Sequence, residues 1–341
     1  MIVETKLLKV DEKSIRLACE LLKKGEVVAV PTETVYGLAG NATDASAIKK
    51  IFEAKGRPAD NPLIVHISSI DMLDGIVSEF NDNAKKLAKA FWPGALTIIM
   101  PKGNKVCNET SAGLDSVGVR MPANETARRI IEESGIPFSA PSANISGRPS
   151  PTTPQDVFDD MNGKIPLIID GGTCDAGVES TVISVLEDIP VILRPGIITK
   201  EDIEQVLGKE VLLAKEVVVG VQDDSIVRSP GMKYKHYAPK ANVVIVKGEL
   251  TNFIKFVEKN KTGNTFVMCF DGEESLMPVS AVTYGQKYDS KTQAHKVFAI
   301  LRSLDKLQAN NIFVRCPDIS GVGLAVYNRL IRSAGFKIVE C

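Results

Sequence analysis

The stretch Val27-Val-Ala-Val-Pro-Thr-Glu-Thr-Val-Tyr-Gly-Leu38 indicates the type of fold, because a short apolar strand runs directly into an irregular segment. Val27 to Val30 predicts a buried strand, and Pro31 ends it without a helix following. Short strands joined by irregular loops are typical of a mixed sheet rather than a regularly alternating parallel sheet. The hydroxyls of Thr32 and Thr34 would emerge at the strand end, a common ligand position, unless they only cap local backbone.

The rest of the first two-thirds of the chain alternates helical and strand patterns. Apolar spacing predicts helices over residues 14–23, 44–55, 82–91, 125–133 and 200–207. Apolar runs predict strands over residues 63–67, 96–100, 117–121, 167–170, 180–186 and 191–194. These elements predict an α/β domain around a mixed sheet.

Beyond residue 240 the alternation becomes regular. Strands are predicted over residues 243–246, 265–270 and 312–315, and helices over 250–259, 293–307 and 324–334. This order predicts a smaller, doubly wound unit with parallel strands. Since 341 residues also favour two cores, we predict domains at residues 1–208 and 241–341, with a linker at 209–240.

Composition excludes some classes of protein. The formal net charge is only -1, with 44% hydrophobic and 24% charged residues, so nucleic acid or membrane binding would need a local patch. No apolar run is long enough to span a bilayer, and residues 1–11 do not resemble a signal peptide. Six single cysteines without a Cys-x-x-Cys pair indicate reduced thiols, and we expect a cytoplasmic protein. With only three histidines in the chain, a metal site built from protein side chains is not expected. The sequence also lacks a phosphate-loop motif, which argues against a classical nucleotide-binding loop.

Two segments nearly ninety residues apart indicate an anion site. Lys55-Gly-Arg57-Pro58 carries two cations just past a helix, and Pro141-Ser-Ala-Asn144 offers a hydroxyl and an amide after an apolar strand. Glycine and proline in both segments would fix the backbone, so a polyphosphate could meet preset donors. Lys55 could instead complement the helix C-terminus, and Ser142 and Asn144 could be ordinary turn residues. Arg57 lies beyond the helix stop at Gly56 and has no such explanation.

Further polar residues lie at the ends of predicted strands. Arg120 and Arg194 each end an apolar strand, as does His66, and Asn61 precedes Pro62 in an extended position. An arginine is more often a surface residue than a ligand, but several in this context favour an oxyanion pocket.

The order of these motifs resembles the threonylcarbamoyl-AMP synthases in their two-domain form. The motifs are Pro31-Thr-Glu-Thr-Val-Tyr-Gly-Leu38, Lys55-x-Arg57, Ser142-x-Asn144, Glu179-Ser-Thr-Val182, Leu193-Arg-Pro-Gly196 and Ser229-Pro-Gly-Met…His-Tyr-Ala-Pro239. The resemblance covers essentially the full length, and the joint order is far more specific than any single motif. It implies a YrdC-type domain with a twisted mixed sheet and helices, followed by a linker and a Rossmann-like domain.

The resemblance also implies a reaction. L-Threonine, bicarbonate and ATP would give L-threonylcarbamoyl-AMP and pyrophosphate, which makes the protein a nucleotidyltransferase. A downstream threonylcarbamoyltransferase would use the product to modify tRNA. Magnesium would arrive with ATP, held mainly by phosphate oxygens and water. No general base is assigned.

Site residues follow from the resemblance, position by position. Lys55 and Arg57 would be the catalytic residues. ATP would be bound by Lys55, Arg57, Asn61, Ser116, Ser142, Asn144, Ser150, Arg194, Tyr234 and His236. L-Threonine would be bound by Thr34, His66, Arg120, the backbone of Ala140, and Ser180. Tyr234 and His236 would act if residues 232–239 fold back as a lid, whereas the alternative is a proline-rich spacer.

Two other functions remain open from the sequence. One is an RNA-binding or ribosome-associated factor without turnover, since related domains present a basic concave face; this predicts steep salt dependence of binding. The other is a carbamoyl-adenylate enzyme like the hydrogenase-maturation carbamoyltransferases, whose zinc-type cysteine pairs this chain lacks.

Overall fold

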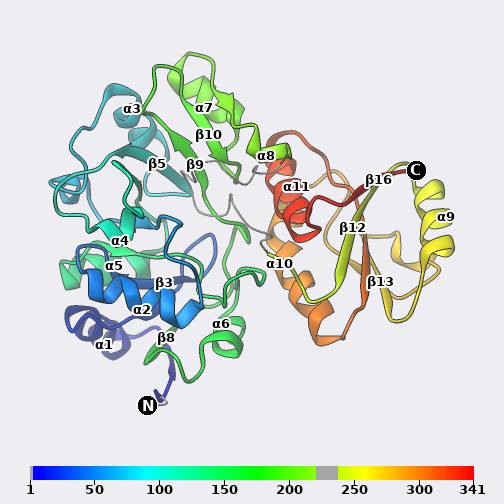
Figure 1. Cartoon of the computed structure of the whole chain (residues 1–341), viewed down its shortest axis with the longest axis horizontal. Helices are drawn as coiled ribbons and strands as arrows, with labels where there is room; N and C mark the ends of the chain where they lie inside the picture. Colours follow the sequence, from blue (N-terminus) through cyan, green and yellow to red (C-terminus); the bar gives the residue numbers. More distant parts are fainter. Residues whose placement is uncertain (1–2, 220–236) are drawn as a thin grey trace.

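The computed structural model describes residues 3–219 and 237–341, which form two domains with one sheet each (Figure 1). Within these residues, no helix combines the length and the hydrophobicity that crossing a membrane requires. The cysteines are free thiols, as the sequence predicts. The linker residues Tyr234 and His236, predicted to contact ATP, lie outside the described residues.

The first sheet has eleven described strands and is mixed, as predicted. The strands are β1 (Lys6–Lys9), β2 (Val28–Val30), β3 (Gly37–Asn41), β4 (Ile64–His66), β5 (Leu96–Pro101), β6 (Ser116–Arg120), β7 (Phe138–Ser139), β8 (Leu167–Asp170), β9 (Thr181–Ser184), β10 (Val191–Arg194) and β11 (Leu212–Leu213). Their order is β1-β8-β2-β3-β7-β4-β6-β5-β9-β10-β11. β4 and β6 pair parallel, whereas β5 and β6 pair antiparallel. Because β11 pairs with β10, this sheet continues beyond residue 208.

Helices surround this sheet. They are α1 (Glu12–Lys23), α2 (Ala45–Lys55), α3 (Asp82–Phe91), α4 (Asn108–Ser111), α5 (Glu125–Ser134), α6 (Pro154–Met161), α7 (Lys200–Leu207) and α8 (Glu216–Val219), with a short 3-10 helix, η1, at Ile70–Leu73. One core lies between α1, α5 and the sheet, where Ile15, Leu22, Ile130 and Phe138 are buried together.

Helix α2 shows how the local sequence positions the pocket residues. The Asp44 side chain accepts a hydrogen bond from the Ser46 amide and caps the N-terminus. Gly56 ends the helix in the left-handed conformation, with φ of 59°, which a glycine adopts without strain. Ile48 and Ile51 are buried on one face, so the helix is fixed in orientation. Arg57 therefore leaves the helix end at a defined point.

The second sheet is parallel and smaller, as predicted. It contains β12 (Asn242–Lys247), β13 (Thr265–Cys269), β14 (Ala281–Thr283), β15 (Asn311–Arg315) and β16 (Ile338–Glu340), in the order β14-β13-β15-β12-β16. Its helices are α9 (Leu250–Asn260), α10 (Ser290–Lys306) and α11 (Gly321–Ser333), with a 3-10 helix, η2, at Glu274–Leu276. All of its described strand pairs are parallel.

Helices α10 and α11 face the first domain (Figure 1). The core beneath them includes Val35 and Val178 of the first domain, so the two domains share one buried apolar cluster. At Gly177, a Cβ atom would lie 2.4 Å from the Cα atom of His295 on α10, which only a glycine permits. The two domains are therefore closely packed rather than merely linked.

Candidate functional site

A pocket in the first domain opens where the ends of several strands meet, and the second domain borders it. We call it the main pocket. Its wall is formed by Thr32, Thr34, Val35, Gly37, Arg57, Ile64, His66, Arg120, Ala140, Pro141, Ser142, Glu179, Ser180, Arg194 and Tyr237. Eight of these residues are among the site residues predicted from the sequence: Thr34, Arg57, His66, Arg120, Ala140, Ser142, Ser180 and Arg194.

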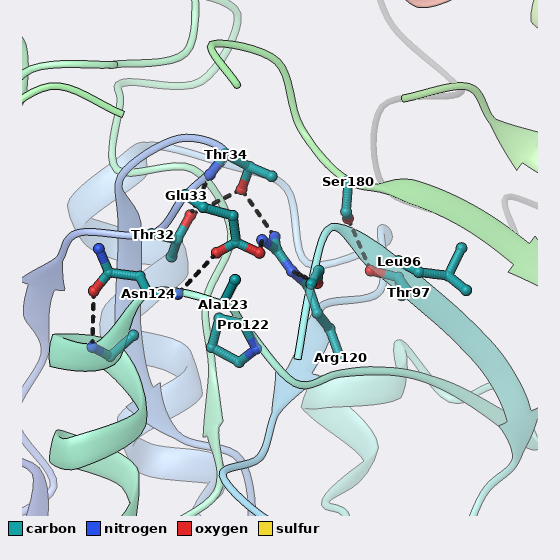
Figure 2. A network of polar contacts seen from close by, with 12 residues as sticks. Thr32, Glu33, Thr34, Leu96, Thr97, Arg120, Pro122, Ala123, Asn124 and Ser180 are labelled. Carbon is teal, nitrogen blue, oxygen red and sulfur yellow. Dashed lines mark hydrogen bonds and ion pairs between the residues drawn. The ribbon is translucent and has the colours of Figure 1, made fainter. Parts of the chain in front are cut away.

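Arg120 is held at one end of the main pocket by three partners. Its Nε donates to the Gly94 carbonyl at 3.1 Å, its Nη1 donates to Thr34 Oγ1 at 2.9 Å, and its Nη2 lies 2.6 Å from Glu33 Oε1 (Figure 2). Although burial alone would raise it, the pKa of Glu33 is lowered by the neighbouring guanidinium. These contacts leave one N–H on each terminal nitrogen of Arg120, which can bind an anionic group.

His66 is neutral in this pocket. Burial and the nearby Arg120 charge lower its pKa to about 3. Its Nδ1 lies 3.1 Å from the Ile64 carbonyl, and a carbonyl can only accept, so Nδ1 carries the proton. The ring stacks against Phe138, with centroids 5.6 Å apart. The other nitrogen, Nε2, is therefore an acceptor for an O–H or N–H group.

We expect His66 to make the protein less stable in acid. The folded protein keeps His66 neutral down to about pH 3, whereas the unfolded chain takes up a proton near pH 6.5. This contribution to the free energy of unfolding is complete above pH 6.5 and is lost as the pH falls towards 3. Urea unfolding of His66→Gln should therefore depend less on pH between 7 and 4 than wild-type unfolding.

The exposed His295 provides the matched control for this measurement. Urea unfolding of His295→Gln, measured in parallel, reports what the loss of an exposed imidazole does. An identical pH dependence for wild type and His66→Gln would contradict a neutral buried imidazole.

Lys55 joins the two segments predicted to form the anion site, although it lies behind the pocket wall. Its ammonium is buried and donates to the carbonyls of Ser142 and Asn144, the latter at 2.8 Å. Burial, and then the charge of Arg57, lower its pKa well below the usual value. Lys55 therefore fixes the loop at 142–144. One ammonium proton is left for a phosphate oxygen.

The side chain of Asn144 supports the same loop. Its Nδ2 donates to the carbonyls of Ile145 and Arg148, at 2.8 and 2.9 Å. Its Oδ1 is buried without a hydrogen-bond partner, as is Oδ1 of Asn61. Neither side chain lines the main pocket, so both act from behind the wall.

Arg57 and Arg194 bring further positive charge to the pocket wall. Arg57 is half-buried and donates through Nη2 to the carbonyls of Asn61 and Pro62, at 3.1 and 3.4 Å. Burial lowers the pKa of Arg57 to about 10, so it stays charged at neutral pH. Arg194 donates to the carbonyl and to the hydroxyl of Ser180, at 3.1 and 3.2 Å. With Arg120, these residues bring three guanidinium groups from separate segments to one pocket.

Ser150, predicted to bind ATP, is hydrogen-bonded to a neighbouring carboxylate. Its hydroxyl donates to Glu179 Oε1 at 2.5 Å, and it does not line the main pocket. Glu179 in turn pairs with Arg329 of the second domain, whose Nε lies 2.7 Å from Oε2. The sequence-based assignment did not include Glu33, Glu179, Tyr237 or Arg329. Glu33 and Glu179 lie inside the motifs that resemble the synthase family, whereas no motif near Arg329 indicates that it contacts the site.

Ser116 lies in a neighbouring apolar cleft rather than in the main pocket. This side cleft is lined by Pro62, Leu63, Ile64, Thr97, Ile99, Leu114, Ser116, Gly118 and Val182. The two hollows share Ile64, so they are adjacent. Across the described residues, no group of three or more His, Cys, Asp or Glu side chains could hold a metal ion.

Comparisons with known proteins cover both domains. A family model described as "Telomere recombination" matches residues 20–196, and one described as "Threonylcarbamoyl-AMP synthase, C-terminal domain" matches residues 198–335. The threonylcarbamoyl-AMP synthases of Pyrococcus abyssi and Bacillus subtilis are each 43% identical to this chain. The alignments cover 97% of both proteins for P. abyssi, and 98% of this chain and 96% of its relative for B. subtilis.

A solved structure is also similar over the full length. The crystal structure of P. abyssi Sua5 complexed with L-threonine matches with a TM-score of 0.88 and 42% sequence identity, covering 100% of each chain. The two-domain architecture is therefore shared with that protein.

Proposed function

This chain belongs to the threonylcarbamoyl-AMP synthase family, and from that premise we propose that its main pocket binds L-threonine beside the phosphates of ATP. The observation that carries the proposal is the convergence of Arg57, Arg120 and Arg194 on one wall. Guanidinium groups suit carboxylates and phosphates, since they donate in fixed pairs and stay charged. A pocket with three of them fits a triphosphate next to an amino acid.

L-Threonine would lie at the Arg120 end. The free N–H groups of Arg120 would hold its carboxylate. His66 Nε2 would accept from the threonine hydroxyl or amine. The Ala140 N–H already donates to the Ile64 carbonyl at 3.1 Å, so the Ala140 carbonyl is the backbone atom suited to the amine. Thr34 and Ser180 would complete this end.

Such an arrangement would select threonine over valine. Valine lacks the hydroxyl, so it would leave a buried hydrogen-bonding group without a partner. The resulting discrimination would be much larger than that from a missing methyl group alone.

ATP would extend from Arg57 towards the side cleft. Arg57, Arg194 and Ser142 would meet the phosphates. Lys55 would mainly hold the loop that carries Ser142, and it would donate its remaining proton to a phosphate oxygen. The flat adenine would fit the apolar side cleft, where Ser116 could hydrogen-bond to its edge. Asn61, Asn144 and Ser150 would support these groups from behind, rather than touch the nucleotide directly.

The reaction would proceed in two bond-forming steps. First, the threonine ammonium would lose a proton, and the free amine would then attack the bicarbonate carbon, giving a carbamate and releasing water. A carbamate oxygen would then attack the α-phosphorus, and the bond to the β-phosphate oxygen would break to release pyrophosphate. This second step would be a nucleotidyl transfer, which depends on positioning and on stabilising negative charge.

Magnesium would enter with ATP. Glu179, the one carboxylate among the described residues of the pocket wall, is already hydrogen-bonded to Ser150 and Arg329. The ion would therefore be coordinated mainly by phosphate oxygens and water, and it would offset phosphate charge. The product would pass to a tRNA-modifying threonylcarbamoyltransferase, in the cytoplasm where tRNA is modified.

Purified protein tests this function directly. With ATP, Mg²⁺, bicarbonate and labelled L-threonine, pyrophosphate should form together with an adenylate that carries the threonine label. Omitting threonine, or replacing it with L-valine, should reduce pyrophosphate release to background. Equal release without threonine would contradict the proposed reaction, and salt-sensitive RNA binding without turnover would favour the RNA-binding alternative.

A further inference from the structure

A carboxylate in the wall of the main pocket presents an electrostatic problem. Glu179 is only 7% exposed and lines the pocket together with Arg57 and Arg194. If the pocket binds ATP as proposed, an uncompensated carboxylate there would repel the triphosphate. Its charge must therefore be offset by another group.

The offsetting group comes from the second domain. Arg329 on α11 is fully buried, and its Nε donates to Glu179 Oε2 at 2.7 Å. Its Nη1 donates to Asn328 Oδ1 at 2.9 Å, and its guanidinium lies 5.6 Å from the ring centre of Tyr237. Burial alone would raise the pKa of Glu179, but Arg329 and Arg194 lower it to about 2. The carboxylate thus remains ionised and paired.

Glu179 connects Arg329 to two parts of the pocket wall. Its Oε1 accepts from Ser150, at the end of the loop that also contains Ser142 and Asn144. On its other side it is joined to Ser180, whose carbonyl and hydroxyl accept from Arg194. A change in the position of Glu179 would therefore reach both the loop and Arg194.

A second arginine of the same domain fixes the neighbouring residue of the loop. Arg302 on α10 donates through Nη2 to the Pro149 carbonyl at 2.6 Å and to Asp160 Oδ2 at 2.9 Å. Asp160 also accepts from the Ile145 amide at 3.2 Å. The loop is thus tied to the second domain at Pro149 as well as through Glu179.

We infer that Arg329 is a positioning residue for the nucleotide, supplied by the C-terminal domain and acting through Glu179. It neutralises Glu179 beside the bound phosphates and fixes Ser150 and Ser180 in the pocket wall. The C-terminal domain therefore completes the ATP site of the first domain. This inference rests on the proposed function, because it requires a triphosphate in the main pocket.

Substitution of Arg329 in the full-length protein tests this inference. In Arg329→Met, Glu179 remains buried without its partner, so we expect the KM for ATP and the Kd of ATP without threonine to rise about 30-fold. The KM for L-threonine should change much less, because Arg120 is not altered. Arg329→Lys keeps a charge that can reach Glu179, and it should fall between Arg329→Met and wild type.

The double variant Glu179→Gln/Arg329→Met separates this role from a purely structural one. It removes both charges, so no uncompensated carboxylate remains, and ATP affinity should return to within about fivefold of wild type. Arg315→Met is the matched control, since Arg315 is buried in the same domain and also pairs with a glutamate, Glu273, but does not line the main pocket. It should leave the KM for ATP unchanged.

Two outcomes would overturn the inference. One is an ATP affinity of folded Arg329→Met equal to that of Arg315→Met. The other is a double variant that folds but binds ATP as weakly as Arg329→Met, and this arm remains decisive even if the single variant does not fold. Wild-type protein that binds ATP but releases no pyrophosphate would instead contradict the proposed reaction, and it would leave the binding test of Arg329 intact.

Discussion

Replacing Arg120 by lysine is expected to raise the KM for L-threonine about 100-fold, because two charge-assisted hydrogen bonds to the carboxylate would be lost. Lysine keeps the charge but has no planar fork. It cannot donate at once to the Gly94 carbonyl and to Thr34 while it pairs with Glu33, as the guanidinium does. The remaining ammonium would turn towards Glu33 and away from the substrate. The KM for ATP should change by less than about fivefold, since Arg57 and Arg194 remain. Steady-state kinetics with each substrate varied in turn would measure both effects.

Arg128→Lys is the matched control for this variant. Arg128 donates to the carbonyls of Pro122 and Ala123, just after β6, but it does not line the main pocket. It reports what the loss of an arginine near the same loop does to stability and turnover. If Arg120→Lys raised the KM for threonine no more than Arg128→Lys does, Arg120 would be a structural partner of Glu33 and not a carboxylate ligand.

The pairing of Arg120 with Glu33 limits the electrostatic cost of burying the Arg120 end of the pocket. The ion pair is nearly neutral as a unit, with side chains 5% and 12% exposed, so little charge is buried without compensation. A zwitterionic amino acid is neutral overall as well. The proposed threonine site would therefore suit a zwitterion better than a free anion.

The sequence predicts well those elements whose ends are determined locally. Helix α2 was predicted over residues 44–55 and is observed at Ala45–Lys55, because Asp44 caps one end and Gly56 ends the other. By contrast, β3 (Gly37–Asn41) was not predicted, since Gly-Leu-Ala-Gly-Asn has little strand propensity. Its strand conformation depends on pairing with β2 and β7, which a single sequence does not reveal.

The candidate site shows the same contrast between residues that local motifs predict and contacts that depend on tertiary packing. Residues that follow strands, such as Thr34 and Arg194, could be predicted from their motifs and do line the pocket. Lys55 and Ser150 have the predicted neighbours, but their polar atoms are bonded to the loop and to Glu179. The partner of Glu179 lies 150 positions further along the chain, in a helix whose apolar spacing was predicted without any sign of the inward-facing Arg329. Such contacts depend on how the domains pack, and no local pattern encodes them.

Replacing Arg57 by alanine should weaken ATP binding about 100-fold while leaving the thermal midpoint nearly unchanged. Arg57 is half-buried, and its described donors reach two backbone carbonyls of its own loop, at Asn61 and Pro62. Its loss should therefore cost little in folding, since water can reach those carbonyls. Its charge, which persists to about pH 10, is instead available to phosphate oxygens. Calorimetric titration with a non-hydrolysable ATP analogue, alongside thermal unfolding, would measure both quantities.

Lys55→Met should show the opposite balance, because the Lys55 ammonium is buried and holds the carbonyls of Ser142 and Asn144. Its removal leaves the Asn144 carbonyl unpaired, while the Ser142 carbonyl keeps only the Asn144 amide, at a cost of about 1–3 kcal/mol in the free energy of unfolding. Lys50→Ala, on the same helix but paired with Glu26 at the surface, controls for loss of positive charge and should affect neither quantity. A large loss of stability in Arg57→Ala with unchanged affinity would assign Arg57 to the fold. Arg57 would then have the structural role that burial predicts for Lys55. The structure predicts the reverse assignment, because the buried ammonium supports the loop and the half-buried guanidinium can reach the nucleotide.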